Sequence, residues 1–411
     1  MELRKAERAD IRPLAELWTH AFPGRRTVAD RVRQLETGIP YGGIDCSWVL
    51  EDGRRIAGAF RTYRMTQYLA GAALPMMGLA AVAVAPGYRR RGLGKRLVRD
   101  ALRLAYERGD VVSVLYPFRP DFYRSLGWGL VGELHRYRFR PEALAEYAGG
   151  PAVHLADPGD RGAIARCYAR VARSANGPIH RDDRAWTYHL DALGAHPFVY
   201  REGDEVRGYL LAVYSRAGSR ARRALVVREL VAEDDVAYRA LLGWIAEQRD
   251  QWPVVRYDAR PDERFDLRLR DPRPPGHGAA RALWDPAARI LRGPMLRVVN
   301  VERALAARVE WGPEPGFGLT LSVQVEDQEL PENRGPWHVT IEEGGARVRA
   351  DGNGGADARL VTDAPTFAQI YAGELSPTAA QRLGRAAIDG ARETLDRVFR
   401  PRSAFWLMDE F

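Results

Sequence analysis

The segment from Met76 to Gly109 restricts the fold more than any other part of this chain. A continuous apolar run over 76–85 predicts a strand that is buried on both faces. After the turn, a helical face starts at Leu93, and its apolar members recur at Leu97, Val98, Ala101, Leu104 and Ala105. Gly109 fits a helix C-cap, and the apolar stretch 111–118 predicts the next strand. Strand, loop, helix and strand in this order predict a βαβ unit.

The loop of this unit carries an unusual concentration of positive charge. Arg89, Arg90 and Arg91 directly precede Gly92 and Gly94, with Lys95 one residue further on. The first backbone N–H groups of a helix and its macrodipole favour an anion, and glycine lets a ligand approach the backbone closely. Arginine and lysine would add charge-assisted hydrogen bonds to phosphate oxygens. Two interpretations remain open on these grounds, a phosphate-binding loop and a solvated basic turn. Neither a Walker motif nor GxGxxG is present.

An internal echo indicates that this unit occurs twice. The segment Val49–Gly58 resembles Val199–Gly208, and each predicts two strands joined by a tight turn. In the first copy the hairpin spans 46–69 and follows a predicted helix over 11–21. In the second copy a strand over 224–232 and a helix over 237–251 follow. Acidic residues stand there in place of the arginines and would repel a phosphate: Glu233, Asp234 and Asp235.

The last part of the chain predicts a different architecture. Alternating strands follow residue 295, and helical segments over 365–375 and 378–399 come last, which is typical of an α+β domain. A stretch rich in glycine and proline over 146–160 predicts a boundary. We therefore expect three domains, at 1–147, 148–292 and 293–411.

Composition excludes several function classes. The 411 residues are 46% hydrophobic and 28% charged, without an apolar run long enough for a membrane helix or a secretory signal, so we expect a soluble cytoplasmic protein without a membrane partner. The 62 basic residues are interleaved with 54 acidic ones, which argues against a nucleic-acid partner. With two cysteines and no HExxH spacing, we expect no metal site.

The basic loop resembles a known motif. Arg89 to Gly94 reads RRRGLG and resembles the R/Q-x-x-G-x-G/A pyrophosphate loop of the GCN5-related N-acetyltransferases (GNATs). The resemblance implies acetyl-CoA as acetyl donor. It assigns the pyrophosphate to the residues from Arg89 to Lys95, Leu93 included, and the pantetheine arm to the backbone of Val82 and Val84.

The organisation of the whole chain resembles the Eis (enhanced intracellular survival) family. That resemblance implies tandem GNAT folds, α/β in class and with the second copy degenerate, followed by a sterol-carrier-protein-2-like α+β domain. It also implies an N-acetyltransferase that forms a homo-oligomer, commonly a hexamer. The acceptor implied is a primary amine of a cationic small molecule, aminoglycoside- or polyamine-like, or of a lysine side chain.

Two residues are candidates for proton transfer by the same resemblance. Tyr123, in the segment PDFYRSLGWG, matches the family's catalytic tyrosine, and a phenol is protonated at neutral pH and can act as a general acid. The chain ends in SAFWLMDEF, and in the Eis family the C-terminal carboxylate enters the active site as a base, which assigns that role to Phe411. Their alternatives are a packing aromatic and an apolar tail that seals a domain interface.

Acceptor-binding residues are expected near both ends of the chain. Asp409 and Glu410 would lie at the pocket rim and attract an amine, and Phe22 matches a pocket aromatic. Gly24 stands near where aminoglycoside-acetylating members carry an acidic residue, and Arg25 and Arg26 follow it. This departure argues against efficient aminoglycoside acetylation. Two other function classes remain open, an apolar-ligand carrier built on the third domain and a CoA-binding regulator without turnover.

Overall fold

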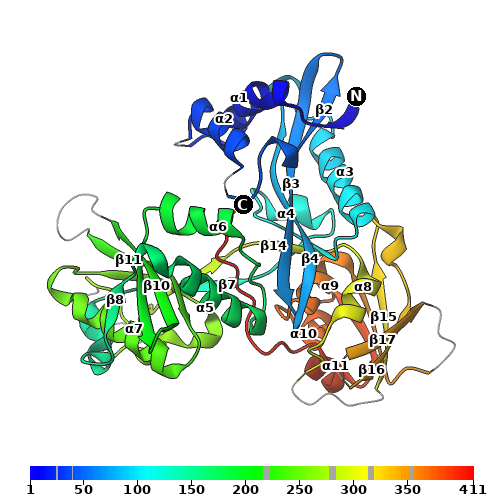
Figure 1. The fold of residues 1–411 in the computed structure, drawn as a ribbon. Coiled ribbons are helices and arrows are strands. Elements are labelled where there is room, and N and C mark those ends of the chain that lie inside the picture. The colour runs from blue at the N-terminus through cyan, green and yellow to red at the C-terminus, as the bar shows by residue number, and fades with distance from the viewer. Residues whose placement is uncertain are drawn as a thin grey trace. The chain divides into compact units, whose positions relative to one another are not determined.

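The computed structural model describes residues 1–24, 26–38, 40–215, 223–276, 284–312, 319–343, 345–350 and 355–411, and they form two compact units. Each unit is built from separate stretches of chain. Unit 1 contains Met1–Gly132, Ala175–His180 and Pro294–Phe411, and unit 2 contains Glu133–Ser174 and Arg181–Gly293. Figure 1 shows the chain coloured from end to end.

Unit 1 contains a seven-stranded mixed sheet. Its strands, in spatial order, are β1 (Glu2–Lys5), β2 (Ser47–Asp52), β3 (Arg55–Leu69), β4 (Ala72–Val84), β5 (Val112–Leu115), β14 (Met295–Val298) and β6 (Gly129–Leu130). β4 and β5 are parallel and are connected through helix α3 (Leu93–Arg108), which confirms the predicted βαβ unit. The predicted helix over 11–21 is α1 (Ile11–Ala21), and α2 (Val28–Thr37) and α4 (Pro120–Arg124) complete this part.

Unit 2 repeats this order of elements. Its seven-stranded sheet has the spatial order β13 (Arg289–Arg292), β7 (Glu133–Phe139), β12 (Val255–Ala259), β11 (Ala224–Ala232), β10 (Glu205–Ser215), β9 (His196–Glu202) and β8 (Val153–Leu155). The β9–β10 hairpin corresponds to β2–β3, and the parallel pair β11–β12 is connected through helix α7 (Asp235–Glu247). The helices α5 (Arg161–Ser174) and α6 (Asp183–Thr187) precede that hairpin. The predicted duplication is confirmed.

The rest of unit 1 is the predicted α+β part. Its five-stranded sheet has the spatial order β17 (Gly345–Ala350), β16 (Trp337–Glu342), β15 (Thr320–Glu326), β18 (Ala358–Asp363) and β19 (Ala386–Gly390). Its helices are α8 (Val301–Ala307), α9 (Ala364–Tyr371), α10 (Pro377–Arg382) and α11 (Arg392–Val398). The continuous helix expected over 378–399 is wrong, because β19 pairs with β18 in its middle. Gly384 and Gly390 adopt positive φ angles on either side of β19 and interrupt the helical backbone.

The sheets do not follow the boundaries proposed from the sequence. β7 lies before residue 147 but belongs to the second sheet, and β14 lies after residue 293 but pairs with β5 and β6 in the first. The compact units are discontinuous in sequence. The division of the chain into 1–147, 148–292 and 293–411 therefore remains a proposal.

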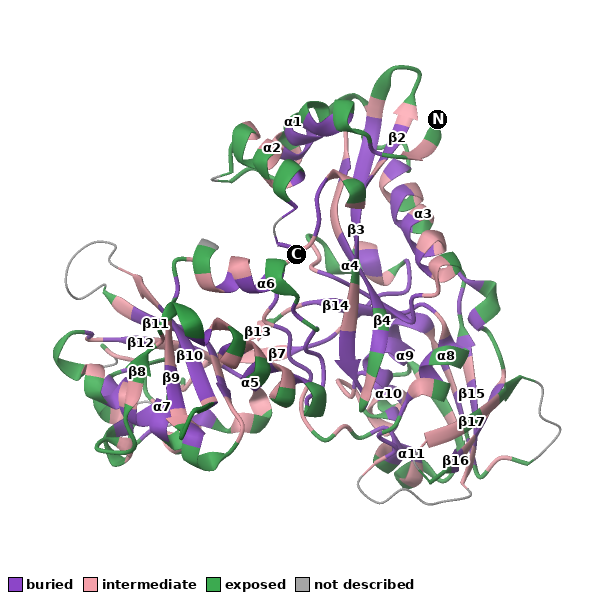
Figure 2. Ribbon diagram, in the orientation of Figure 1, coloured by how far each residue is buried: buried purple, intermediate pink, exposed green. Residues whose placement is uncertain are grey.

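Buried side chains join the first sheet to the third segment. Figure 2 shows buried residues along β3, β4, β14 and α9. One hydrophobic core contains Met76 and Val112 of the first sheet together with Phe367 and Ile370 of α9. A second core lies between the same sheet and α3 and includes Leu97 and Trp128. No helix in the described ranges combines the length and the apolar composition needed to cross a bilayer.

A buried ion pair also joins these parts of unit 1. Arg297 of β14 donates from Nη2 to Asp327 Oδ2 over 2.5 Å, and both side chains are only 1% exposed. Asp327 also accepts hydrogen bonds from the Asn333 amide and from the backbone N–H groups of Glu329 and Leu330. Removing one partner of such a pair leaves an uncompensated buried charge.

We predict that Asp327→Ala lowers the free energy of unfolding by about 3–5 kcal/mol, because Arg297 loses its counter-charge. Thermal and urea denaturation followed by tryptophan fluorescence measures the change. Asp389→Ala is the matched control, since Asp389 is exposed on β19 in the same unit. Equal stability of the two variants would contradict the prediction.

Candidate active site

The site is created where β4 and β5 separate. Their parallel pairing extends only from Met76–Val112 to Gly78–Val114, and β5 ends at Leu115, while β4 continues to Val84. Beyond Gly78, backbone groups on this edge of β4 are therefore not engaged by β5. A bulge between the pairs Ala59–Ala83 and Arg61–Ala80 strengthens the distortion, and within it Ala81 has a φ angle of 52°. The Ala81 carbonyl accepts a hydrogen bond of 2.8 Å from Trp18 Nε1.

The predicted anion loop lies at the N-terminus of α3. Gly92 is the N-cap with a φ angle of 77°, a conformation that glycine adopts without strain, and no side chain caps the helix. A Cβ atom at Gly92 would meet nothing within 4 Å, so the backbone faces open space. The side chains of Arg89, Arg90, Arg91 and Lys95 are exposed. Uncapped N–H groups surrounded by cations fit a pyrophosphate.

The other residues predicted to bind acetyl-CoA offer it their backbone and not their side chains. Leu93 is 8% exposed and packs into the core under α3, so only its backbone N–H can serve a ligand. Val82 and Val84 are half-buried on the part of β4 that pairs with β3 but no longer with β5, so the edge that β5 leaves open can face an extended ligand. These positions agree with the pantetheine assignment, which stays a proposal.

A cavity of about 300 Å³ opens beside the separated strands. It is lined by aromatic rings, three arginines, Gln34 and the bulged part of β4: Trp18, Phe22, Arg26, Arg31, Gln34, Arg61, Tyr63, Leu79, Ala80, Ala81, Val82, Tyr116, Phe118, Tyr123 and Phe411. The structure therefore brings Tyr123, Phe411, Phe22 and Val82 of the predicted site together. Arg25 lies outside the described residues.

Tyr123 is held by aromatic packing. It lies in α4 and is 4% exposed, with Phe118, Phe122 and Trp128 around its ring at centroid distances of 5.7, 5.0 and 6.4 Å. Burial raises the pKa of Tyr123 to about 12, because the phenolate would lose its hydration. The hydroxyl is therefore a proton donor throughout the neutral range.

The last residues of the chain are bound inside unit 1. Tyr41 donates from its hydroxyl to Asp409 Oδ1 over 3.0 Å, and Tyr116 donates to the Asp409 backbone carbonyl over 2.7 Å. Burial, and then the charges of Asp409 and Glu410, raise the pKa of Tyr116, which keeps this donor protonated. In Figure 1 the C-terminus lies close to α4, which carries Tyr123.

The Phe411 ring fills the opening between the strands. It packs edge-on against Tyr41, Tyr63 and Tyr116, with centroid distances of 6.1, 6.2 and 5.7 Å. A Cβ atom on Gly78 would lie 3.0 Å from this ring, so the glycine allows the close approach. The glycine inside the apolar run 76–85 was a sequence signal for a closely packed neighbour.

The two acidic residues near the C-terminus do not line the cavity. Asp409 is 1% exposed and engaged by Tyr41, so the rim position predicted for it is wrong. Glu410 is exposed and is not part of the described lining. Sequence reasoning also missed Arg31, Arg61 and the tyrosines 41, 63 and 116. Nothing in their local sequence distinguishes them from ordinary surface or strand residues.

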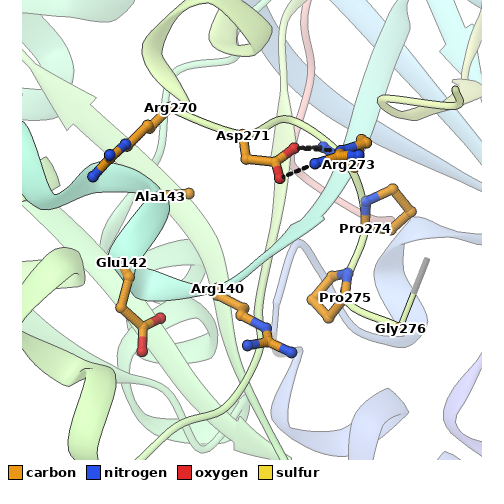
Figure 3. A pocket seen from close by; sticks show the side chains of 9 residues that line it. All are labelled: Arg140, Glu142, Ala143, Arg270, Asp271, Arg273, Pro274, Pro275 and Gly276. Atoms are coloured by element: carbon orange, nitrogen blue, oxygen red, sulfur yellow. Dashed lines mark hydrogen bonds and ion pairs between the residues drawn. The ribbon is translucent and has the colours of Figure 1, made fainter. Parts of the chain in front are cut away.

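A second cavity, of about 650 Å³, lies in unit 2. It is lined by Arg140, Glu142, Ala143, Arg270, Asp271, Arg273, Pro274, Pro275 and Gly276, and Figure 3 shows Asp271 paired with Arg273. The two hydrogen bonds from the Arg273 guanidinium to Asp271 measure 2.9 and 2.8 Å. Its described lining holds no tyrosine, histidine or cysteine for proton transfer. The first cavity is therefore the candidate active site.

Comparison with known proteins supports this choice. Models of the acetyltransferase (GNAT) domain match residues 2–131 and 177–298, and a sterol carrier protein domain matches 301–408. A sequence from Streptomyces griseus described as an uncharacterized N-acetyltransferase is 30% identical over 424 residues, covering 96% of this chain and 94% of the relative. N-acetyltransferase Eis of Mycobacterium tuberculosis is 30% identical over 247 residues, or 57% of this chain and 58% of Eis. The chain belongs to the Eis family of GCN5-related N-acetyltransferases.

The fold agrees with that assignment. Eis1 from Mycobacterium abscessus superimposes with a TM-score of 0.79 at 23% identity, and the match covers 100% of both chains. This Eis-family chain is therefore an N-acetyltransferase with tandem GNAT folds and a sterol carrier protein domain. The GNAT fold implies acetyl-CoA as acetyl donor. Among the described residues, no group of three or more His, Cys, Asp and Glu side chains could hold a metal.

We predict that replacing Arg89, Arg90 and Arg91 together by glutamine weakens CoA binding by about tenfold or more, because charge-assisted hydrogen bonds to phosphate are lost. Isothermal titration with CoA measures the effect. Arg12→Gln is the control, since Arg12 is an exposed arginine of α1 outside the loop. An unchanged dissociation constant in the triple variant would show that the loop is only a solvated turn.

Proposed function

We propose that this Eis-family enzyme transfers the acetyl group of acetyl-CoA directly to a primary amine in the 300 Å³ cavity, with Tyr123 as general acid and the Phe411 carboxylate as general base. One observation carries the proposal, namely that Tyr123 and Phe411 line the same cavity beside the unpaired edge of β4. Acetyl-CoA would supply an activated acetyl thioester there.

Each group of the chain then has a defined task. The amine nitrogen forms a bond to the acetyl carbon, and the Phe411 carboxylate accepts the proton that the nitrogen loses. Backbone N–H groups near Val82 would hold the negative carbonyl oxygen. When the carbon–sulfur bond breaks, the Tyr123 hydroxyl donates its proton to the sulfur. The products are an N-acetylated amine and CoA, and exchange with solvent restores both residues.

The acceptor remains to be assigned within the class of primary amines. A volume of about 300 Å³ is at the lower end of ligand cavities, which are about 300–1,000 Å³, and it favours a small acceptor. The cationic acceptors implied by the family resemblance would meet three arginines in the lining. Kanamycin, tobramycin, spermidine and a lysine peptide are the panel that tests them. The homo-oligomer, the hexamer and the cytoplasmic location also stay predictions.

The two other function classes have less support. An apolar-ligand carrier requires an open apolar interior, yet Phe367, Ile370 and Leu360 fill the core of the third segment and are fully buried. A CoA-binding regulator needs neither the buried phenol nor a docked C-terminus. Turnover with any amine separates the enzyme from the regulator.

We predict that Tyr123→Phe lowers kcat by about 10²–10⁴, because the leaving sulfur loses its proton donor, while CoA binding is retained. CoA release measured with a thiol reagent gives the rate, and Tyr106→Phe on α3 is the control.

Since the pKa of Tyr123 is raised to about 12, its acid form persists at alkaline pH. The rate should therefore rise with amine deprotonation and show no alkaline decline from pH 8 to 10.5. A decline near pH 10 would contradict the raised pKa of Tyr123, whereas an unchanged kcat of Tyr123→Phe would remove Tyr123 from the acid role.

We predict that a Gly-Ser extension after Phe411 lowers kcat by at least about 10²-fold, because it displaces the carboxylate from the cavity. The matched control carries the same two residues before Met1, which is 47% exposed. Both proteins are compared by CoA release and by CoA binding. Full turnover of the extended protein would leave Phe411 with a packing role only.

A further inference from the structure

The charges of the cavity point to a specific class of acceptor. Its lining contains three guanidinium groups, those of Arg26, Arg31 and Arg61, and no acidic side chain among the residues described. The proposed base contributes a single carboxylate at Phe411. Such a pocket attracts an anionic group and repels a polycation.

Arg61 provides the strongest observation. Its side chain comes from β3 and is 3% exposed, and it contacts the faces of Trp18 and Tyr63 at 5.7 and 5.0 Å. Nη2 donates to the backbone carbonyls of Gly42 and Gly43, whereas Nε is buried without a hydrogen-bond partner. A buried guanidinium that lacks a carboxylate is costly unless a ligand supplies the missing charge and acceptor.

Arg31 repeats this arrangement from α2. Its Nη2 donates to the Phe22 carbonyl over 3.1 Å, and its Nε is buried without a partner. Burial, and then the charge of Arg26, lower the pKa of Arg31. The charge of Arg26 therefore acts on Arg31, and the two cations repel one another. A bound anion would relieve this repulsion.

The rest of the lining describes the body of the acceptor. Trp18, Phe22, Tyr63 and Phe118 present apolar ring surfaces, while Tyr123 and Phe411 carry the proposed proton transfers. A ligand that uses all three features has an amine, an apolar or aromatic body and an anionic group. Arginine binds carboxylates through paired, geometrically specific hydrogen bonds.

We propose that the acceptor is a small aromatic or apolar amine that also bears a carboxylate, and that Arg26, Arg31 and Arg61 bind this carboxylate. The inference rests on the proposed acetyl transfer and narrows its acceptor. It departs from the cationic acceptor expected from the sequence, for which the lining offers no acidic side chain in the described residues.

The test compares two acceptors of the same shape, one with a carboxylate and one with a neutral carboxamide. 4-(Aminomethyl)benzoate and 4-(aminomethyl)benzamide have the same amine and ring, and the amide lacks the negative charge. We expect kcat/KM for CoA release to be about tenfold or more higher with the benzoate, given the strength of hydrogen bonds between charged groups. Kanamycin is the polycationic comparison and should be the poorest of the three.

Three variants assign this preference to the cavity. Arg31→Gln should lower the ratio of kcat/KM for the benzoate to kcat/KM for the benzamide toward one. Arg26→Gln should reduce the advantage too, and because Arg26 is exposed, this variant avoids a loss of folding. Arg33→Gln is the matched control, since Arg33 is an exposed arginine of α2 that does not line the cavity.

The outcomes separate this inference from the proposed function. Equal or faster turnover of the benzamide, a preference for kanamycin, or an unchanged preference in both cavity variants would overturn the carboxylate assignment and leave the acetyl transfer intact. If no amine gives turnover, the proposed function fails. Titration of the CoA-bound protein then decides the inference, because tighter binding of the benzoate than of the benzamide supports it and equal binding overturns it.

Discussion

The separation of β4 from β5 after Gly78 is the constraint on which the rest of the site depends. A parallel pair normally continues its hydrogen bonding along both strands, but here β5 ends while β4 runs on to Val84. The freed edge offers backbone groups to an extended ligand, and the following turn places the uncapped N-terminus of α3 at the end of that edge. The early end of β5 thus creates two adjacent sites, one for an extended ligand along β4 and one for an anion at the N-terminus of α3.

Such an opening would expose apolar surface unless another part of the chain covered it. The C-terminal residues do so, because Phe411 packs against Gly78 and three tyrosines, and Tyr41 and Tyr116 bind Asp409. The third segment can deliver this end because β14 and α9 are built into unit 1 with the first sheet. The third segment therefore shares a core with the first sheet and contributes Phe411 to the lining of the candidate site.

Two groups of arginines surround this site, and their environments differ. Arg89, Arg90 and Arg91 are exposed, so their attraction for a phosphate competes with water and falls with salt. Arg61 is buried and Arg31 half-buried, and each has an Nε without a hydrogen-bond partner, so these two guanidinium groups are already partly desolvated. An anion bound to them gains more because less water must be displaced. Arg89, Arg90 and Arg91 stand out as a motif because they are consecutive and precede a turn. The burial of Arg31 and Arg61 cannot be recognised from the local sequence.

The sequence by itself determined the βαβ unit, its duplication and the loss of the basic loop in the second copy, and its resemblance to a known family supplied the candidates Tyr123 and Phe411. These features depend on local periodicity, on turn residues and on motifs contained in short segments. The exchange of β7 and β14 between the sheets, the strand β19 inside an expected helix, and the burial of Asp409 were decided by the tertiary structure alone. Each of them depends on contacts between residues far apart in the chain. The arginine-lined cavity belongs to the same group, because Arg31 of α2 and Arg61 of β3 line one cavity only in the folded chain, and no local pattern encodes that.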